Sequence, residues 1–139
     1  MAIASRLKWF LDVNQASYDV APGAAPGGSQ VVSDLYHDAR GYLMVVHPAS
    51  RKIALAALRE RTGRPLHPAR AHELRDIFFD CQQGAIPALG PAYGVPTIVD
   101  DDVRDESDVY FRGGDAKDWI HMRGADLMHL VAGESGEAS

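Results

Sequence analysis

The chain has 139 residues, of which 46% are hydrophobic and 24% charged, and its formal net charge is −5. This length suits one domain with its own core. The net negative charge argues against a protein that coats nucleic acid and against DNA as a partner. The absence of a bilayer-length apolar run or a signal-peptide segment argues against a membrane partner. The single cysteine, Cys81, excludes an internal disulfide, so we expect a cytoplasmic protein.

The first third of the chain predicts a helix, a loop and a β-hairpin. Apolar residues recur at helical spacing over residues 2–13. A short extended piece at 18–20 precedes a glycine- and proline-rich loop at 21–30, which lacks the lysine of a phosphate-binding loop. Two apolar runs, 31–37 and 42–47, are separated by turn residues and predict the hairpin.

The middle of the chain predicts two helices followed by a strand. Ser50 is a suitable N-cap for a helix over 51–61, which Gly63 would end. A second helix is predicted at 69–79. The apolar segment 95–99 then predicts a short strand, which a run of aspartates stops.

The C-terminal third predicts a second pair of strands and a final helix. These elements are strands at 109–111 and 119–122, the Gly113–Gly114 turn between them, and a helix at 125–131. Because strands and helices do not alternate regularly, we expect an α+β fold with a mixed or antiparallel sheet and flanking helices. The domain would span residues 1–132, and residues 133–139 would form a polar tail.

One stretch, Asp80–Asp101, stands out because it combines conformational freedom with stiffness. It holds three glycines and three prolines: Gly84, Gly90, Gly94, Pro87, Pro91 and Pro96. Glycines let a ligand approach the main chain, whereas prolines fix φ and remove amide donors. Two interpretations remain open: a cradle of main-chain amides for an anion or oxyanion, and a rigid connection between strands.

The charges are distributed unevenly along the chain. Residues 51–76 hold seven basic residues against three acidic ones, whereas residues 100–139 hold four basic residues against eleven acidic ones. The basic segment could contact a phosphate locally, or it could be the solvated face of a helix.

Individual side chains give few signs of chemistry. The six histidines form no metal-binding motif, so we expect neither a metal nor another cofactor. Cys81 is either a nucleophile or a small buried side chain, and the adjacent Asp80 would raise the pKa of a thiol. His121 is either a proton-transfer group or a hydrogen-bonded structural residue. No Gly-x-Ser-x-Gly elbow of a serine hydrolase is present.

Taken together, several segments resemble the YbaK / prolyl-tRNA-synthetase-associated family of aminoacyl-tRNA editing domains. The matching segments are Arg40–Ser50, Gly84–Gly90, Gly94–Asp100, Val109–Phe111 with Gly113–Gly114, and Ile120–His121 with Ala125–Leu127. The resemblance covers roughly residues 30–131.

The resemblance implies a compact domain with a barrel-like mixed sheet that hydrolyses the ester of mischarged aminoacyl-tRNA without a metal. The amino acid and the terminal adenosine would lie under a loop whose amides face the reacting carbonyl, and the catalytic positions would be Gly84, Ala85, Ile86 and Ala88. The substrate-binding positions would be Val32, Pro87, Gly90, Gly113, Gly114, His121, Arg51 and Lys52. The partner would be the acceptor end of an aminoacyl-tRNA, whose backbone the basic segment would contact.

Three departures from the family pattern bear on activity. The family's catalytic lysine falls at Val32, beside Ser33, and its loop proline falls at Ala88, one residue after Pro87. A helix that walls the family's pocket has no room in residues 21–30. Two main readings therefore stay open: a weak trans-editing deacylase, and a catalytically degenerate member that binds tRNA, a nucleotide-like ligand or a protein partner. A homodimer whose second copy closes the pocket is a third reading.

Overall fold

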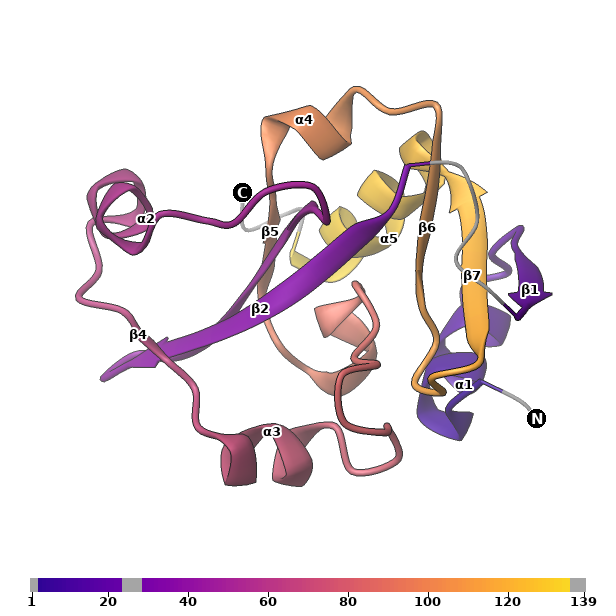
Figure 1. Cartoon of the computed structure of the whole chain (residues 1–139), viewed down its shortest axis with the longest axis horizontal. Helices are drawn as coiled ribbons and strands as arrows, with labels where there is room; N and C mark the ends of the chain where they lie inside the picture. Colours follow the sequence, from indigo (N-terminus) through magenta and orange to yellow (C-terminus); the bar gives the residue numbers. More distant parts are fainter. Residues whose placement is uncertain (1–2, 24–28, 136–139) are drawn as a thin grey trace.

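The computed structural model describes residues 3–23 and 29–135, and its strands form two sheets (Figure 1). The four-stranded sheet has the order β4-β2-β3-β5, and the three-stranded sheet has the order β1-β7-β6. The strands are β1 (Asp19–Pro22), β2 (Val31–Asp38), β3 (Gly41–Pro48), β4 (His67–Pro68), β5 (Thr97–Val99), β6 (Asp108–Arg112) and β7 (Asp118–Arg123). Because β3 and β5 are parallel and the other pairs antiparallel, the expected mixed α+β fold is confirmed.

Helices cover the sheets and connect them. They are α1 (Ser5–Val13), α2 (Leu55–Thr62), α3 (Ala71–Ile77), the 3-10 helix η1 (Gly90–Tyr93), α4 (Asp101–Arg104) and α5 (Gly124–Ser135). The C-terminal helix α5 packs against β5 in one sheet and against β6 and β7 in the other, so both sheets share one core. By contrast, α2 lies at the far side of the four-stranded sheet, away from β6 and β7 (Figure 1).

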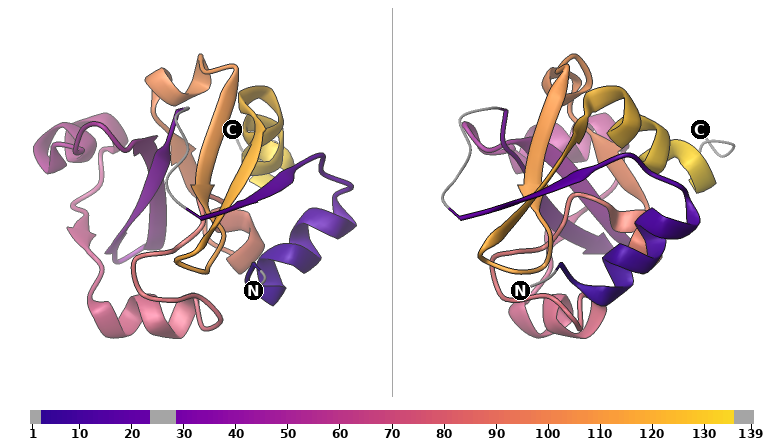
Figure 2. Two further views of the ribbon diagram at one scale, coloured as in Figure 1. Left: turned by 45° about the vertical axis from the view of Figure 1, so that its right-hand side comes forward. Right: turned by 90° about the vertical axis from the view of Figure 1, so that its right-hand side faces the viewer.

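The two sheets approach a barrel without closing into one. Among the described residues, a single parallel bridge between Gln30 and Tyr110 joins the start of β2 to β6. The views in Figure 2 show the three-stranded sheet turned against the four-stranded one rather than continuing it. The barrel-like sheet that the resemblance implied is therefore two linked sheets.

The β2–β3 hairpin decides which side chains face the interior. Gly41 has a φ of 122°, which a glycine tolerates in the turn, and Val32 pairs with His47 in the register. Val31, Ser33 and Leu35 point to one face of β2, and Val32, Asp34 and Tyr36 to the other, because side chains alternate along a strand. The first face contributes Val31 and Leu35 to the main core, and the second contributes Tyr36 to a smaller core beneath α2.

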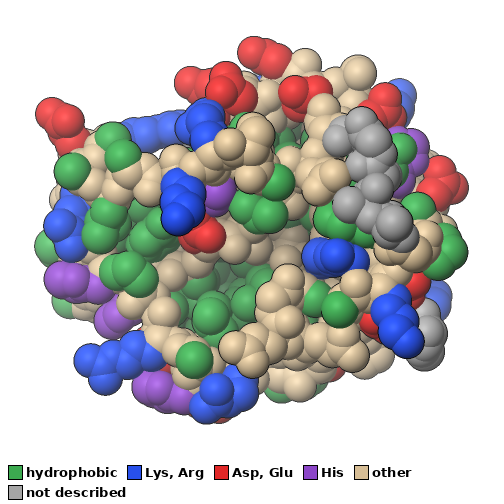
Figure 3. All heavy atoms as spheres, viewed as in Figure 1, with side chains coloured by type: hydrophobic (Ala, Val, Ile, Leu, Met, Phe, Trp, Pro, Cys, Tyr) green, Lys and Arg blue, Asp and Glu red, His purple; other side chains and the backbone are tan. Residues whose placement is uncertain are grey.

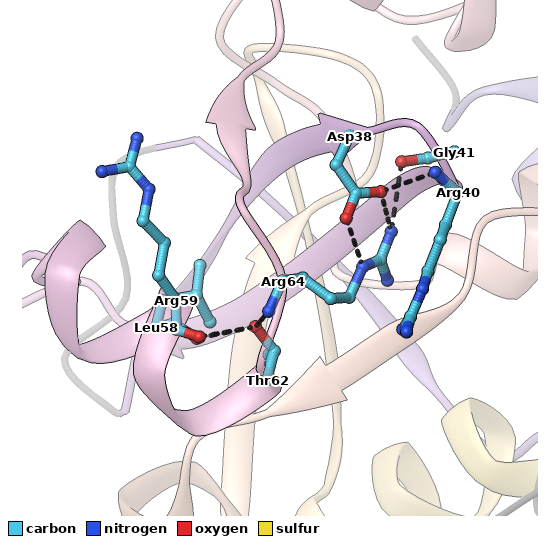
Figure 4. Close-up of polar contacts among 7 residues, drawn as sticks. All are labelled: Asp38, Arg40, Gly41, Leu58, Arg59, Thr62 and Arg64. Atoms are coloured by element: carbon cyan, nitrogen blue, oxygen red, sulfur yellow. Dashed lines mark hydrogen bonds and ion pairs between the residues drawn. The ribbon is translucent and has the colours of Figure 1, made fainter.

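An ion pair ties the turn of this hairpin to the segment after α2. Arg64 donates from Nε and Nη2 to the two carboxylate oxygens of Asp38, at 2.9 and 2.6 Å, and from Nη2 to the carbonyl of Gly41 at 3.3 Å (Figure 4). The Asp38 side chain is only 4% exposed. This bidentate contact holds one end of the hairpin in place.

Most predicted elements are confirmed, but the helix expected over 51–61 begins later. It spans Leu55–Thr62, and its N-cap is Ala54, which makes no side-chain cap, rather than Ser50. Arg51 instead binds two aspartates after β5, which keeps the start of this segment outside the helix. The predicted stop at Gly63 is confirmed, with a left-handed φ of 68°.

Three further differences concern the chain after residue 69. The helix expected over 69–79 is shorter, at Ala71–Ile77. Asp100 does more than end β5: its carboxylate accepts from the Asp102 amide and caps α4. The last helix continues to Ser135, past the expected start of the tail. Residues 24–28 of the predicted loop and 136–139 of the tail lie outside the described residues.

Candidate active site

The loop over residues 84–90 is fixed at its start by the turn between β6 and β7. Gly84 has a φ of 81°, and the Ala85 amide donates to the carbonyl of Gln82 at 3.0 Å. Gly114 donates to the Ala85 carbonyl at 2.9 Å, and its own carbonyl accepts from the Gln82 amide at 2.8 Å. The Gly113–Gly114 turn therefore braces the loop.

Several amides of this loop have no partner within the described part of the chain, and three of them lie on either side of Pro87. The N–H groups of Ile86, Ala88 and Leu89 form no hydrogen bond there, and Pro87 has no N–H to offer. Ala88 and Leu89 are fully buried. Buried donors are normally hydrogen-bonded, and of these three residues it is Ile86, which is half-buried, that lines the two cavities described below.

Ser33 is the residue of β2 that reaches this loop. Its hydroxyl lies 3.4 Å from the carbonyl oxygens of both Ile86 and Pro87 and can donate to either. Val32, which counting from the hairpin glycine had placed at the family's lysine position, points to the opposite face of β2 and is 39% exposed. On β2 it is therefore Ser33, and not Val32, that faces the loop, because a one-residue shift along a strand reverses the face.

A cavity of about 250 Å³, here called the central hollow, lies beside Ser33 and the loop. Its lining consists of Ser33, Asp34, Leu35, Tyr36, Met44, Pro68, Ala69, Leu74 and Ile86. A second cavity of about 140 Å³ shares Leu74 and Ile86 with it and extends along α3 to Arg75 and Gly84. Figure 3 shows this face of the molecule, with apolar side chains at the bottom of a depression.

The two cations predicted to bind substrate, Arg51 and Lys52, lie away from the central hollow. Among the described residues, no lysine or arginine lines the central hollow, and Arg75 on α3 lines only the adjoining cavity. Arg51 and Lys52 line a different cavity of about 240 Å³, beside α2. Arg51 is also engaged, because its Nη2 lies 2.7 Å from both Asp100 and Asp102.

Two other predicted positions, His121 and Gly90, make their contacts away from the central hollow. The His121 ring lies on the three-stranded sheet, where Nε2 is 2.9 Å from Asp108 and Nδ1 is 3.4 Å from Asp19, and it stacks on Tyr110. It lines neither cavity beside the loop. Gly90 is required by packing, since a Cβ there would lie 2.0 Å from Thr97 Oγ1.

Cys81 is not an activated nucleophile. Its Sγ contacts the Tyr93 hydroxyl at 3.3 Å and Asp80 at 3.6 Å. Burial, and then the charge of Asp80, raise the pKa of the thiol to about 11. Burial likewise raises the pKa of Tyr93, and its hydroxyl donates to Asp80 at 2.7 Å. A thiol with such a pKa is almost entirely protonated near neutral pH.

Neither a metal cluster nor a membrane span is found in residues 3–23 and 29–135. No group of three or more histidine, cysteine or acidic side chains in these ranges is arranged to hold a metal ion. None of the helices there combines the length and the apolar character needed to cross a bilayer.

Three residues of this region escaped the sequence-based prediction: Ser33, Leu74 and Arg75. Leu74 was recognised only as an apolar residue of a helix, and Arg75 only as one charge of the basic segment. Alternation along β2 was the one sequence signal that could have identified Ser33. Val31 and Leu35, two residues before and after it, are apolar and predict that this face of the strand points into the core.

Comparisons with known proteins agree with this fold. No curated protein matches the chain. The structure is similar to a candidate trans-editing enzyme for prolyl-tRNA synthetase, with 19% identity, a TM-score of 0.78, and coverage of 91% of this chain and 89% of the other. It is also similar to a candidate signal transduction protein from Marinobacter aquaeolei VT8, with 20% identity and a TM-score of 0.80. That match covers 96% of this chain and 29% of the other, so the chain spans under a third of that protein.

The sequence itself matches a family model over residues 23–130, which is most of the chain. That model describes the aminoacyl-tRNA editing domain. The hairpin, the 84–90 loop and all the strands described above except β1 lie within the matched range. The chain belongs to the aminoacyl-tRNA editing domain family.

Proposed function

We propose that this chain is a trans-editing deacylase that hydrolyses the ester bond of mischarged aminoacyl-tRNA. The observation that carries the proposal is the set of unpartnered amides at Ile86, Ala88 and Leu89, in a loop whose Ile86 lines the central hollow. Family membership and the trans-editing neighbour support the same substrate class.

The amides would act on the charge that ester hydrolysis creates. Water attacks the ester carbonyl, and negative charge grows on its oxygen while the new carbon–oxygen bond forms. Fixed N–H donors lower the energy of that oxyanion. The ester carbon–oxygen bond then breaks, the departing tRNA oxygen takes the proton that the attacking water gives up and becomes a hydroxyl, and the free amino acid leaves.

The apolar lining of the central hollow fits an uncharged aminoacyl side chain. Leu35, Met44 and Leu74 offer no ion-pair partner to a charged side chain. Asp34 at the same cavity is already engaged by His47.

The lack of a cation at the loop predicts slow turnover. Ser33 occupies the place beside the loop from which an ammonium group could reach the substrate, and a hydroxyl carries no charge. One lost charge-assisted contact costs about 2–4 kcal/mol, or roughly 30- to 1,000-fold in rate. Arg75, at the adjoining cavity, is the nearest substitute that the lining residues offer.

The same observation favours a second candidate function. A family member without the cation could bind tRNA or a nucleotide-like ligand without cleaving it. A protein partner or a second copy of the chain would be the occupant if no tRNA binds.

The test is single-turnover hydrolysis of a panel of mischarged tRNAs by the wild-type chain and three variants, Ala69→Trp, Ala39→Trp and Ser33→Lys. Ala69→Trp fills the central hollow, whereas Ala39→Trp adds the same side chain to the exposed hairpin turn. We expect slow hydrolysis of at least one tRNA, retained in Ala39→Trp and lost in Ala69→Trp. Rates equal to buffer for the whole panel, with Ser33→Lys included, would overturn the enzymatic proposal and leave binding to be measured directly.

A further inference from the structure

The central hollow is lined by one charged side chain, and its charge is negative. Asp34 is the one acidic residue among those that line it, and no lysine or arginine of the described residues does so. The Tyr36 hydroxyl at the same cavity stays neutral near pH 7, because burial, and next the charge of Asp34, raise its pKa to about 12. A cavity with apolar walls and a single carboxylate favours a ligand that combines an apolar body with a positive charge.

Asp34 borders the hollow because this stretch of β2 is an edge of the sheet. In the register, β4 pairs with Tyr36 and His37 but not with Asp34. Side chains from both faces of β2 can therefore border the same space. Ser33 and Leu35 line the hollow from one face, and Asp34 lines it from the other. The Asp34 side chain is 41% exposed, so a ligand can reach it from solvent.

One oxygen of the Asp34 carboxylate is held by the protein, and the other is free. Oδ2 lies 2.8 Å from Nε2 of His47, a buried residue of β3, and 3.5 Å from the Tyr36 hydroxyl. Oδ1 has no hydrogen-bond partner among the described residues. Because the first oxygen fixes the group in place, the second can accept a hydrogen bond from a ligand with little reordering of the side chain.

We propose that Asp34 Oδ1 binds the α-ammonium group of an aminoacyl ester in the central hollow. The inference rests on the proposed function, which supplies the ester. Asp34 directly follows Ser33, the residue that meets the carbonyl oxygens of the 84–90 loop, and consecutive Cα atoms lie about 3.8 Å apart. The ammonium and the carbonyl of an aminoacyl ester are bonded to the same carbon atom. The groups that bind them must therefore be close neighbours, as Asp34 and the loop are.

This contact gives the substrate one orientation and defines its class. With the ammonium at Asp34 and the carbonyl oxygen at the loop amides, the aminoacyl side chain is left to face the apolar lining residues Leu35, Met44 and Leu74. The negative charge repels RNA phosphates, which keeps the tRNA backbone out of the hollow. The preferred substrate is therefore an ester with a free α-amino group and an uncharged side chain, in contrast to an N-acylated ester such as a peptidyl-tRNA.

Binding of three non-hydrolysable adenosine derivatives to the wild-type chain tests the charge of the ligand. Each is a 3′-amido-3′-deoxyadenosine, and the acyl groups are valyl, its α-hydroxy counterpart and N-acetylvalyl. We expect the valyl compound to bind about 10- to 100-fold more tightly than the other two, because only its ammonium can donate charge-assisted hydrogen bonds to the carboxylate. Equal affinities for the valyl and hydroxy compounds would overturn the proposal.

Asp34→Asn tests the residue, and Asp105→Asn, which removes the same charge just after α4, is the matched control. In Asp34→Asn we expect the preference for the valyl compound over the hydroxy compound to disappear, whereas Asp105→Asn should keep it. A preference that survives in Asp34→Asn would overturn the assignment. If Asp34→Asn fails to fold, carbon-13 NMR of the wild type decides. The Asp34 carboxyl signal should then shift with the valyl compound and not with the hydroxy compound.

The results separate this inference from the deacylase itself. Preference for the valyl compound without hydrolysis of any tRNA in the panel would support the ammonium site and contradict the deacylase. Hydrolysis together with equal binding of the valyl and hydroxy compounds would overturn the ammonium site alone. If the wild type binds none of the three compounds, both proposals fail.

Discussion

The Ser33 hydroxyl lies 3.4 Å from the carbonyl oxygen of Ile86, and this contact joins β2 to the loop that carries the unpartnered amides. We predict that Ser33→Lys raises the rate of deacylation by roughly 30-fold or more, because an ammonium group supplies the missing charge-assisted contact. The measurement is single-turnover hydrolysis of the best tRNA substrate.

The matched control for this change is Val32→Lys. It introduces the same side chain one residue earlier, where β2 faces away from the loop. We expect no gain in rate from it. Equal gains from both lysines would show that the effect comes from general attraction of tRNA rather than from the site.

The thiol of Cys81 is predicted to be unreactive and dispensable. Because burial and the neighbouring Asp80 raise its pKa to about 11, alkylation by iodoacetamide at neutral pH should be much slower than in the urea-unfolded chain. Cys81→Ala should leave the rate of deacylation unchanged. Rapid labelling of the folded chain, or loss of hydrolysis in Cys81→Ala, would contradict this prediction and indicate that Cys81 is a nucleophile.

The Asp38–Arg64 ion pair predicts a loss of stability in acid. Hydrogen bonding from Arg64 lowers the pKa of Asp38 to about 2, below its unfolded value of about 3.9. The pair therefore contributes fully above about pH 4, and its contribution is lost as the pH falls toward 2. Wild type should lose unfolding temperature over this range more steeply than Asp38→Asn.

Arg64→Met serves as the second arm of that experiment. It leaves the Asp38 carboxylate buried without its partner, so we expect the unfolding temperature at neutral pH to drop by several degrees. A variant as stable as the wild type at pH 7 would mean that the contact in Figure 4 contributes little.

Lys52 is predicted to contact the tRNA backbone from the cavity beside α2. Unlike Arg51, it forms no ion pair within the described residues. Lys52→Ala should weaken tRNA binding a few-fold and reduce the slope of log affinity against log salt by about one. Lys117→Ala, in the turn between β6 and β7, removes the same charge elsewhere. Equal losses in both variants would indicate only a change in net charge.

Local patterns in the sequence predicted the β-hairpin, the strands on either side of Gly113–Gly114 and the stop at Gly63. These features depend on neighbours within a few residues, such as alternation in a strand or a glycine with positive φ. The predicted start of a helix near Ser50 was wrong. Arg51 binds Asp100 and Asp102, which are distant in sequence, and local patterns do not show such contacts.

The candidate site was predicted less completely than the fold. The glycines and prolines indicated a stiff loop, and the resemblance indicated its chemistry. Which residue of β2 meets that loop depends on the register and face of the strand, and in the structure that residue is Ser33 rather than Val32. The basic segment was visible in the sequence. The structure was needed to show that Arg64 binds Asp38 and that Arg51 binds Asp100.

The most direct test of the proposed site is NMR of the backbone amides during titration with a non-hydrolysable 3′-aminoacyl-adenosine analogue. If the unpartnered amides bind the carbonyl oxygen, the N–H signals of Ile86, Ala88 and Leu89 should shift downfield and saturate together. Binding that leaves these three signals in place while moving residues of another cavity would contradict the proposed site, as would no binding by the wild type or by Ser33→Lys.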